Sequence, residues 1–462
     1  MPPAEKLPHD DPEIDAEIDP ETDSGAPADE PPADVPLLPL RDGLPRIVDT
    51  DAGLAEVCAA LAAGTGPVAI DAERASGYRY SARAYLIQLR REGAGTALVD
   101  PIAFDSLAPL QKVLEGTEWI LHAATQDLPC LTELGLYPTR LFDTELAGRL
   151  LGYPRVGLAS LVETLLGQRM AKEHSAVDWS TRPLPEPWLE YAALDVEMLI
   201  ELREVLAREL VASGKEFWAA EEFDWLRGFT QQARVDQWRR TSGLHKVRGR
   251  RALGAVRALW TTRDQIAAER DVTPTRIIPD SAIIAAALAM PTTRAALKAT
   301  KGFYGRGADR YAGRWVAVLA QVRDLPESQL PTRSPRAEGP PPPRAWADKD
   351  PVAARRLQLA REAITALAEQ QDVPAENLLT PDFVRRVLWT PPHTREEEPL
   401  TRAMAMTLRD FGARAWQVRL TAPLLAEAVL AADREVAEGK VVVEPTQATD
   451  ADEPASTPTE TP

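Results

Sequence analysis

Two carboxylates stand close together in the stretch GPVAIDAER, which covers residues 66–74. The apolar run from Val68 to Ile70 predicts a buried β-strand, and Asp71 and Glu73 follow it two positions apart. Side chains two apart on a strand point to the same side, so both carboxylates are expected at one place beside the core. Acids at a strand end are often simply solvated, whereas a pair of them is also suited to binding a cation. The spacing alone leaves both interpretations open.

A further carboxylate lies inside a predicted helix, in the stretch EPWLEYAALDVEML (residues 186–199). Asp195 comes about two turns after Pro187, where the helix is expected to begin, which is too deep for a capping role. It lies on an apolar stripe, and burying an unpaired charge there costs several kcal/mol. Tyr191 is one turn earlier on the same face. Asp195 is therefore expected to bind this tyrosine, an arginine from elsewhere, or a metal ion.

Asp127, in WILHAATQDLPCLTEL, follows a predicted strand and precedes a predicted helix. Aspartate is a favoured N-cap residue, so a structural role is the simpler interpretation of this position. Cys130 stands where a capping box would have Glu or Gln, so that motif is absent. The sequence leaves a cap and a site residue as alternatives for Asp127.

These acids occur in the order Asp-x-Glu, then Asp, then Tyr-x-x-x-Asp. Four clustered carboxylates need compensation, because like charges in contact raise each other's pKa. Magnesium is the hard cation that prefers carboxylate and water ligands. Two such ions about 4 Å apart clamp the attacking and leaving oxygens of a phosphoryl displacement. That chemistry needs few other side chains, which fits a chain with five His and two Cys that lack metal-type spacing.

Alternating strands and helices are predicted between residues 45 and 210, and they would position these acids. Strands are expected over 68–73, 84–90, 96–99 and 119–123, and helices over 107–114, 128–134, 146–151 and 158–166, with a long helix from Pro187. Three closely spaced strands followed by helices indicate an α/β or α+β layer with a mixed sheet. Beyond residue 220 the pattern is helical throughout. There, ERDVTPTRIIPD (269–280) is echoed by QQDVPAENLLTPD (370–382), which suggests two copies of a small helical domain.

Charge and proline divide the chain further. Of the net charge of −17, residues 1–36 carry −11 and residues 433–462 carry −6, so residues 37–432 are neutral overall. Both ends have few aromatic residues and are expected to be disordered. We predict a disordered acidic tail over 1–40, an α/β domain over 41–212, a helical domain over 226–325, a Pro-rich linker over 326–349, a second helical domain over 350–432, and a disordered acidic tail over 433–462.

The two cysteines and the absence of a long apolar run favour a reduced, cytoplasmic protein that does not enter a membrane. Residues 234–257 contain eight Lys and Arg against one acid, interleaved with Trp238. Such a segment suits nucleic-acid binding by charge and stacking, although a solvated helix face with internal ion pairs is an equal alternative. The candidate nucleic-acid contacts in this segment are Arg239, Arg240, Lys246, Arg248, Arg250 and Arg251. Gln88, on the predicted strand paired near Asp71, is a further candidate.

VAIDAE, HAATQDL and YAALDVEML resemble the three motifs of the DEDD 3′–5′ exonuclease superfamily. FDTELAGRLLG (142–152) and the segment 178–199 resemble the ribonuclease D family more narrowly. Residues 228–325 look like its HRDC domain, and 350–432 look like a weaker second copy. The resemblance implies a ribonuclease H-like exonuclease domain, an α/β fold with a mixed sheet flanked by helices, followed by all-α helical bundles.

By the same resemblance, the catalytic and metal-binding residues would be Asp71, Glu73, Asp127 and Asp195, with Tyr191 orienting the attacking water. Tyrosine four residues before the last Asp places the chain in the tyrosine subclass. Alanine at position 72 replaces the usual threonine, which bears on substrate preference.

The activity implied is a metal-dependent 3′–5′ exoribonuclease that uses two Mg²⁺, with Mn²⁺ as an alternative, and releases nucleoside 5′-monophosphates. The expected substrate is RNA with a free 3′ end, such as tRNA precursors or other structured RNA. Two alternatives remain: a DNA 3′–5′ exonuclease acting on single-stranded DNA, because the same acids serve both sugars, and a non-catalytic nucleic-acid-binding scaffold.

Overall fold

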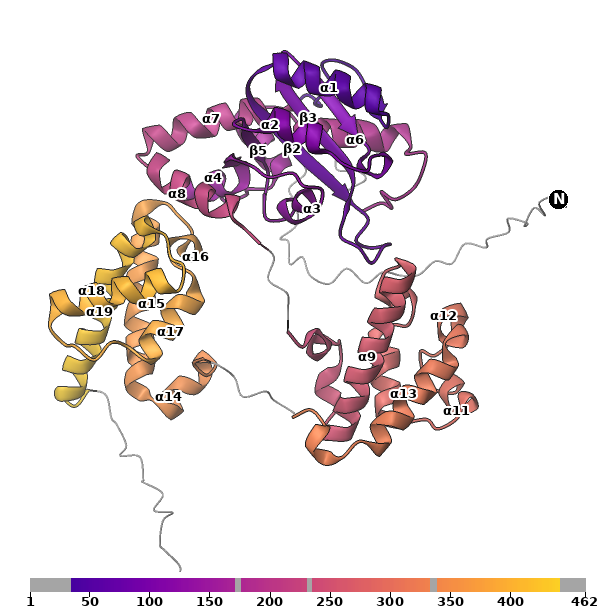
Figure 1. The fold of residues 1–462 in the computed structure, drawn as a ribbon. Coiled ribbons are helices and arrows are strands. Elements are labelled where there is room, and N and C mark those ends of the chain that lie inside the picture. Colours follow the sequence, from indigo (N-terminus) through magenta and orange to yellow (C-terminus); the bar gives the residue numbers. More distant parts are fainter. Residues whose placement is uncertain (1–34, 171–175, 231–234, 333–338, 441–462) are drawn as a thin grey trace, which may run out of the picture.

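A six-stranded mixed sheet lies at the centre of the first half of the chain (Figure 1). The structure is a computed structural model that describes residues 35–170, 176–230, 235–332 and 339–440. In sheet order the strands are β1 (Ile47–Val48), β4 (Gly95–Val99), β3 (Ala84–Glu92), β2 (Thr65–Arg74), β5 (Glu118–Leu121) and β6 (Arg140–Asp143). The strands β2, β3 and β4 form an antiparallel meander, whereas β5 runs parallel to β2 and to β6. The predicted mixed sheet with flanking helices is confirmed.

Helices cover both faces of this sheet. They are α1 (Asp51–Ala63), α2 (Ala108–Leu114), α3 (Leu128–Glu133), α4 (Thr144–Leu150), α5 (Leu158–Leu166), α6 (Glu186–Glu197), α7 (Leu199–Ala212) and α8 (Glu216–Arg227). The predicted long helix from Pro187 is in fact two helices, because the backbone turns at Met198 (φ −108°, ψ 1°). No Gly or Pro marks that position, so the local sequence carries no signal for the break.

Alternation along β2 decides which side chains meet. Val68, Ile70 and Ala72 pack with α1, α2 and α3 in one hydrophobic core. Ala69 packs in the core on the opposite face, together with α7. Asp71 and Glu73 share that second face, since side chains two apart on a strand lie on the same side. The helix α6 packs on the same face against β2, β3 and β4.

The remaining elements are helical, as predicted. The α-helices are α9 (Arg250–Arg270), α10 (Asp280–Ala289), α11 (Arg294–Lys298), α12 (Gly305–Arg310), α13 (Ala312–Asp324), α14 (Trp346–Lys349), α15 (Pro351–Gln371), α16 (Ala375–Leu378), α17 (Pro381–Trp389), α18 (Glu397–Asp410) and α19 (Ala415–Ala437). Short 3-10 helices are η1 (Pro101–Ala103), η2 (Gln237–Arg240), η3 (Leu244–Lys246), η4 (Pro274–Arg276), η5 (Glu327–Gln329) and η6 (Pro343–Ala345). None of the helices in the described ranges has the length and apolarity that crossing a bilayer requires.

The two helical regions are packed differently. The middle region, from η2 to α13, has a hydrophobic core of its own around Trp315. The C-terminal region, from α14 to α19, shares a continuous core with α7, α8 and the sheet. There Trp218 stacks on Trp416 with ring centroids 4.7 Å apart. Arg414 forms an ion pair of 2.6 Å with buried Glu222. The second region is thus fastened to the sheet domain (Figure 1).

The two echoed sequence segments adopt the same local path. The helices α9 and α15 are both 21 residues long and are followed by the C-cap residues Asp271 and Asp372, which have left-handed backbones (φ 47° and 50°). Each is followed by a short helical turn, η4 or α16, and then by a helix that begins at or beside Pro-Asp. The internal repeat inferred from sequence therefore corresponds to a repeated helix–turn–helix.

Parts of the predicted tails and linker are ordered in the structure, so the predicted bounds of these segments extend too far into the folded regions. Leu38 is 3% exposed and its backbone N–H donates to the Arg169 carbonyl at 2.9 Å, although it falls in the predicted 1–40 tail. The helix α19 continues past 432 because Asp433 and Glu435 form ion pairs with arginines of the same region. Trp346, in the predicted linker, is completely buried. The rest of the tails, 1–34 and 441–462, and linker residues 333–338 lie outside the described residues.

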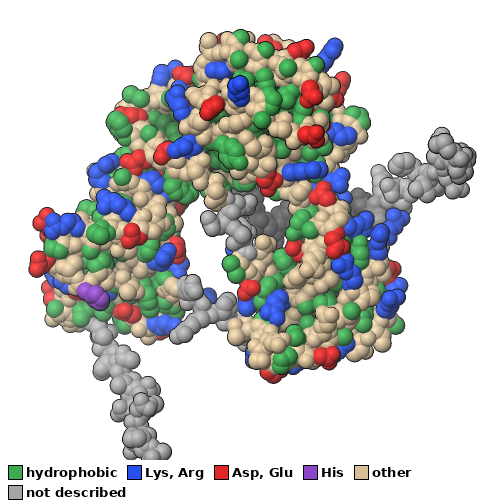
Figure 2. Space-filling view, viewed as in Figure 1, with side chains coloured by type: hydrophobic (Ala, Val, Ile, Leu, Met, Phe, Trp, Pro, Cys, Tyr) green, Lys and Arg blue, Asp and Glu red, His purple; other side chains and the backbone are tan. Residues whose placement is uncertain are grey.

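Positive and negative side chains are interspersed on the surface. On the face shown in Figure 2, Lys and Arg lie among Asp and Glu over the sheet domain and over both helical regions. This mixture agrees with the zero net charge of residues 37–432. Attraction of a polyanion must therefore come from local groups of cations rather than from the field of the whole protein.

Candidate active site

Three of the predicted acids converge at one end of the sheet. Asp71 and Glu73 come from β2 and Asp195 comes from α6, and each offers a carboxylate oxygen within 4.8 Å of the others. Their meeting follows from the alternation along β2, which turns both strand acids toward the face that α6 covers. The helix is held there by apolar contacts of Leu189 and Ala192 with the sheet.

Asp127 joins this group from the loop between β5 and α3. It stands at the N-cap position of α3, yet among the described residues its side chain caps no backbone N–H of that helix. Its carboxyl group is instead hydrogen-bonded to Asp71 and forms an ion pair of 3.2 Å with Arg74. The capping alternative is therefore not what the structure shows. We call Asp71, Glu73, Asp127 and Asp195 the acid cluster.

Asp143 holds the loop that carries Asp127. The Ala123 backbone has a positive φ of 57°, an unfavourable conformation for a residue with a side chain. Asp143, at the end of β6, accepts hydrogen bonds from the N–H of Ala123 (3.2 Å) and Ala124 (2.8 Å), and it caps α4 through Leu146 N–H (3.0 Å). We did not single out Asp143 from the sequence. Its signal was an aspartate directly before a helical pattern, which indicates a cap but not a link to another loop.

Burial makes the acid cluster electrostatically unfavourable without a cation. Desolvation, followed by the charges of Asp71, Asp195 and Asp127, raises the pKa of Glu73 to about 10. Burial is also the first cause that raises the pKa of the other three members, and well above the usual value for Asp127 and Asp195. A buried set of hard oxygen donors with excess negative charge fits a divalent cation such as Mg²⁺.

Tyr191 completes the site. It lies one turn before Asp195 on α6, and its hydroxyl donates a hydrogen bond to that carboxylate. Burial, and then the charge of Asp195, raises the pKa of Tyr191, so its hydroxyl stays protonated at neutral pH. A protonated phenol at the edge of the acid cluster is a hydrogen-bond donor that a reacting water or phosphate oxygen could accept from.

Gln88 does not lie where the predicted nucleic-acid contact requires. It pairs with Asp71 across β2 and β3, but it is 0% exposed under α6. In the described part of the chain, neither atom of its amide has a hydrogen-bond partner. The prediction overlooked the fact that the face of β3 carrying Gln88 is the one that α6 covers. This burial argues against direct contact between Gln88 and RNA.

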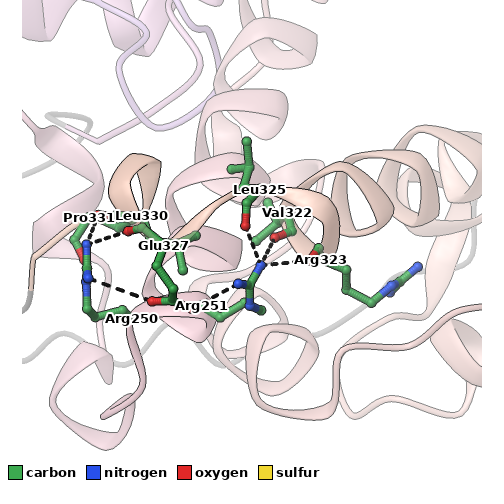
Figure 3. A network of polar contacts seen from close by, with 8 residues as sticks. All are labelled: Arg250, Arg251, Val322, Arg323, Leu325, Glu327, Leu330 and Pro331. Carbon is green, nitrogen blue, oxygen red and sulfur yellow. Dashed lines mark hydrogen bonds and ion pairs between the residues drawn. The ribbon is translucent and has the colours of Figure 1, made fainter.

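Two of the predicted basic contacts hold the middle helical region together instead (Figure 3). Arg251 donates to the carbonyls at the end of α13, those of Val322, Arg323 and Leu325, at 2.7–2.9 Å. Arg250 donates to the carbonyls of Glu327 and Leu330 at 2.8 and 2.7 Å. The Arg251 guanidinium thus satisfies backbone acceptors left open where α13 ends, and that of Arg250 binds carbonyls in and after η5.

The other basic candidates differ among themselves. Arg239 is partly engaged, because it pairs with Asp236 at 2.8 Å and lies 4.2 Å over the Trp238 ring. Arg240, Lys246 and Arg248 are exposed, and within the described ranges no hydrogen bond or ion pair holds their side chains. The structure leaves these three available to a phosphate backbone.

The two groups of arginines should respond differently to mutation. Arg251→Ala is expected to lower the unfolding temperature of the full chain, because the loss of its charged hydrogen bonds destabilises the middle region by about 2 kcal/mol. Arg248→Ala should leave melting unchanged and weaken RNA binding at low salt, where phosphate contacts contribute most. Thermal melting and filter binding would test this. A loss of stability in Arg248→Ala, or none in Arg251→Ala, would contradict the assignment.

The acid cluster also predicts how metal ions and pH affect stability. The pKa of Glu73 is raised from 4.5 to about 10, so the folded metal-free protein keeps a proton that the unfolded chain releases. The contribution of Glu73 to the free energy of unfolding is fully present below pH 4.5 and is lost as the pH rises toward 10. A divalent cation that replaces the proton should stabilise the fold by about 2.7 kcal/mol at one hundred times its Kd.

The increase in melting temperature on adding Mg²⁺ to EDTA-treated protein should therefore be larger at pH 8.5 than at pH 6. Differential scanning fluorimetry of the wild type and Glu73→Gln would measure it, and the variant should show a weaker pH dependence. Equal Mg²⁺ shifts at both pH values would contradict the proposed charge balance.

Similarity to known proteins agrees with this geometry. Family models for a 3′–5′ exonuclease, an HRDC domain and a 3′ to 5′ exonuclease C-terminal domain match residues 45–211, 252–319 and 339–429. A ribonuclease D of Acidiphilium cryptum is 33% identical over 310 residues, which are 64% of this chain and 77% of that protein.

Two crystal structures resemble the whole arrangement. One, of a protein from Bifidobacterium adolescentis, has a TM-score of 0.78 at 37% identity and covers 85% of this chain and 99% of its own. The other is Escherichia coli RNase D, described as an exoribonuclease involved in structured RNA processing. It has a TM-score of 0.60 at 26% identity and covers 80% of this chain and 100% of its own.

Proposed function

The chain belongs to the ribonuclease D family of 3′–5′ exoribonucleases, and from that premise we propose that its acid cluster holds two Mg²⁺ ions, with Mn²⁺ as an alternative. The observation that carries this proposal is the convergence of four carboxylates from β2, α6 and the loop before α3. Exonucleases of this superfamily depend on metal ions, and the donor set here is oxygen only. When bound, two such metal ions would activate a water and stabilise the negative charge on the leaving oxygen.

The chain's own residues would then orient the reacting groups. Asp195 is positioned by the rigid helix α6 and by the Tyr191 hydroxyl. The same hydroxyl, which stays protonated, would direct the attacking water in line with the scissile phosphodiester bond. Water attacks phosphorus and the 3′ oxygen of the penultimate nucleotide takes up the proton. The product is a nucleoside 5′-monophosphate and an RNA shorter by one nucleotide.

We propose structured RNA, in particular tRNA precursors, as the substrate. The chain's similarity to E. coli RNase D, which acts in structured RNA processing, supports this choice, as does the HRDC match over residues 252–319. Arg240, Lys246 and Arg248 of the middle region are available to contact phosphates of the upstream RNA. Both cysteines are free thiols, as the reducing cytoplasm favours, and we place the activity there.

Degradation of 5′-labelled oligonucleotides tests the proposed function. With Mg²⁺, single-stranded RNA and a tRNA precursor with a 3′ extension should shorten one nucleotide at a time from the 3′ end, and EDTA should stop the reaction. Thin-layer chromatography should identify nucleoside 5′-monophosphates. Release of 3′-monophosphates, or shortening from the 5′ end, would contradict the assigned chemistry.

A matched DNA oligonucleotide measures the alternative substrate, because the same carboxylates would serve a deoxyribose chain. If DNA is degraded faster than RNA, the enzyme is a DNA exonuclease by preference. A protein that binds both nucleic acids and cleaves neither would be the non-catalytic scaffold that the sequence left open.

A further inference from the structure

Arg74 is the cation that reaches the acid cluster. Among the ion pairs of the described residues, the one between Arg74 and Asp127 is the one that involves a member of this cluster. The same guanidinium donates to the Gln126 carbonyl at 2.5 Å. Its partners therefore both belong to the loop between β5 and α3.

The strand geometry explains how Arg74 reaches that loop. Adjacent residues on a regular strand point to opposite sides, so Arg74 should face away from Glu73. The pairing of β2 with β3 shifts register between these two residues, however, and such irregularities redirect side chains. Glu73 and Arg74 consequently both contribute to the same site.

The ion pair sets Asp127 apart from the rest of the acid cluster. The other three members bring their oxygens within 4.8 Å of one another, as one cation would require, and Asp127 is outside this group. Its carboxyl group lies instead 3.2 Å from the guanidinium of Arg74. A guanidinium and a divalent cation are alternative partners for one carboxylate, because each supplies the positive charge that a buried acid needs.

Arg74 also faces a cavity that is suited to a nucleotide. With Glu73, Tyr78 and Val177 among its lining residues, the cavity has a volume of about 340 Å³, within the range of small-molecule sites. The Arg74 side chain is 28% exposed, whereas the Asp127 side chain is 5% exposed. The guanidinium thus lies between a buried carboxylate and an open cavity. Its planar fork of donors matches the oxygens of a phosphate.

We propose that Arg74 has two partners: it pairs with Asp127 while the metal site is empty, and it binds the phosphate of the 3′-terminal nucleotide once a divalent cation binds Asp127. This proposal rests on the proposed metal-dependent function. It makes Arg74 a substrate-binding residue whose position reports metal occupancy. Nucleotide binding and metal binding would consequently reinforce each other.

Calorimetry on the full chain without RNA tests the first half. Arg74→Ala should bind Mn²⁺ several-fold more tightly than the wild type, because the cation that competes for Asp127 is gone. If Arg74 only anchors the loop, the same change should weaken Mn²⁺ binding, so the sign of the effect decides. Arg83→Ala serves as a matched control, since Arg83 is an exposed arginine of the same hairpin that lies over the Tyr85 ring, and it should behave as the wild type.

Competition by AMP and adenosine, with Mn²⁺ present, tests the second half. The wild type should prefer AMP, and Arg74→Ala should lose about tenfold or more of that preference, as expected for a charged hydrogen bond to phosphate. Arg74→Lys keeps the charge but not the fork, so it should bind Mn²⁺ like the wild type and recover part of the preference. It also keeps the test available if Arg74→Ala does not fold.

The outcomes separate this inference from the proposed function. A wild type that neither binds Mn²⁺ nor trims RNA would overturn the proposed function itself. A wild type that does both, together with an Arg74→Ala variant of unchanged AMP preference or weaker Mn²⁺ binding, would overturn the role of Arg74 alone.

Discussion

Replacing Asp71 with asparagine is expected to abolish RNA trimming and at the same time to stabilise the metal-free protein. Asp71 lies in the middle of the acid cluster, close to Glu73 and Asp195 and hydrogen-bonded to Asp127. Loss of one metal-binding carboxylate removes charge stabilisation from the transition state, and kcat should fall by at least about 10³-fold. The neutral amide also relieves repulsion among buried carboxylates, so the melting temperature in EDTA should rise or stay unchanged.

Single-turnover kinetics on labelled RNA and melting curves with EDTA and Mg²⁺ would measure both effects. The stabilisation by Mg²⁺ seen for the wild type should largely disappear in Asp71→Asn. Asp105→Asn, at an exposed acid outside the acid cluster, should change neither quantity. An inactive variant that also melts at a lower temperature in EDTA would indicate a folding defect. Near-normal activity of Asp71→Asn would refute the site.

Replacing Tyr191 with phenylalanine should slow the chemical step without removing the metal. The hydroxyl is protonated and donates to Asp195, so its deletion removes one donor and no charge. We expect kcat to fall by about 10²- to 10³-fold, the range for a positioned proton donor or electrostatic stabiliser, with KM nearly unchanged. Calorimetric Mn²⁺ binding should stay within a few-fold of the wild type.

Tyr153→Phe is the matched control for this variant. The Tyr153 hydroxyl donates to Glu209 at 2.6 Å, between α4 and α7, so the same chemical change is made away from the site. Its kcat should equal that of the wild type. If Tyr191→Phe turns over RNA at the wild-type rate, the hydroxyl does not orient the attacking water, whatever its hydrogen bond to Asp195.

Much of the fold and the site could be predicted from local patterns. The strand that carries Asp71 and Glu73 was recognisable from its apolar run, and period-two alternation placed both acids on one side. The pairing of Tyr191 with Asp195 followed from the spacing of one helical turn. Two short strands, β1 and β6, were missed, because two and four residues carry too little pattern to be distinguished from loops.

Other features depended on partners far away in sequence. A cap was the simpler interpretation of Asp127 from the sequence, but contacts with Arg74, 53 positions earlier, and with Asp71 bring it to the acid cluster. Arg250 and Arg251 belong to a basic run that suggested RNA binding, but carbonyls more than 70 residues later take up their donors. The sequence shows that these donors exist but not where the end of α13 will lie.

By itself, therefore, the sequence determined the chemistry available to this protein: four acids and a tyrosine in a set order, on a strand, a loop and a helix whose periods are local properties of the chain. The tertiary structure alone decided which charges balance one another. Gln88 is buried because α6 packs over it. Arg74 contacts Asp127 because the pairing of β2 with β3 shifts register. Alternation and helical spacing act over a few residues, whereas charge compensation depends on distances in space that only the packed fold defines.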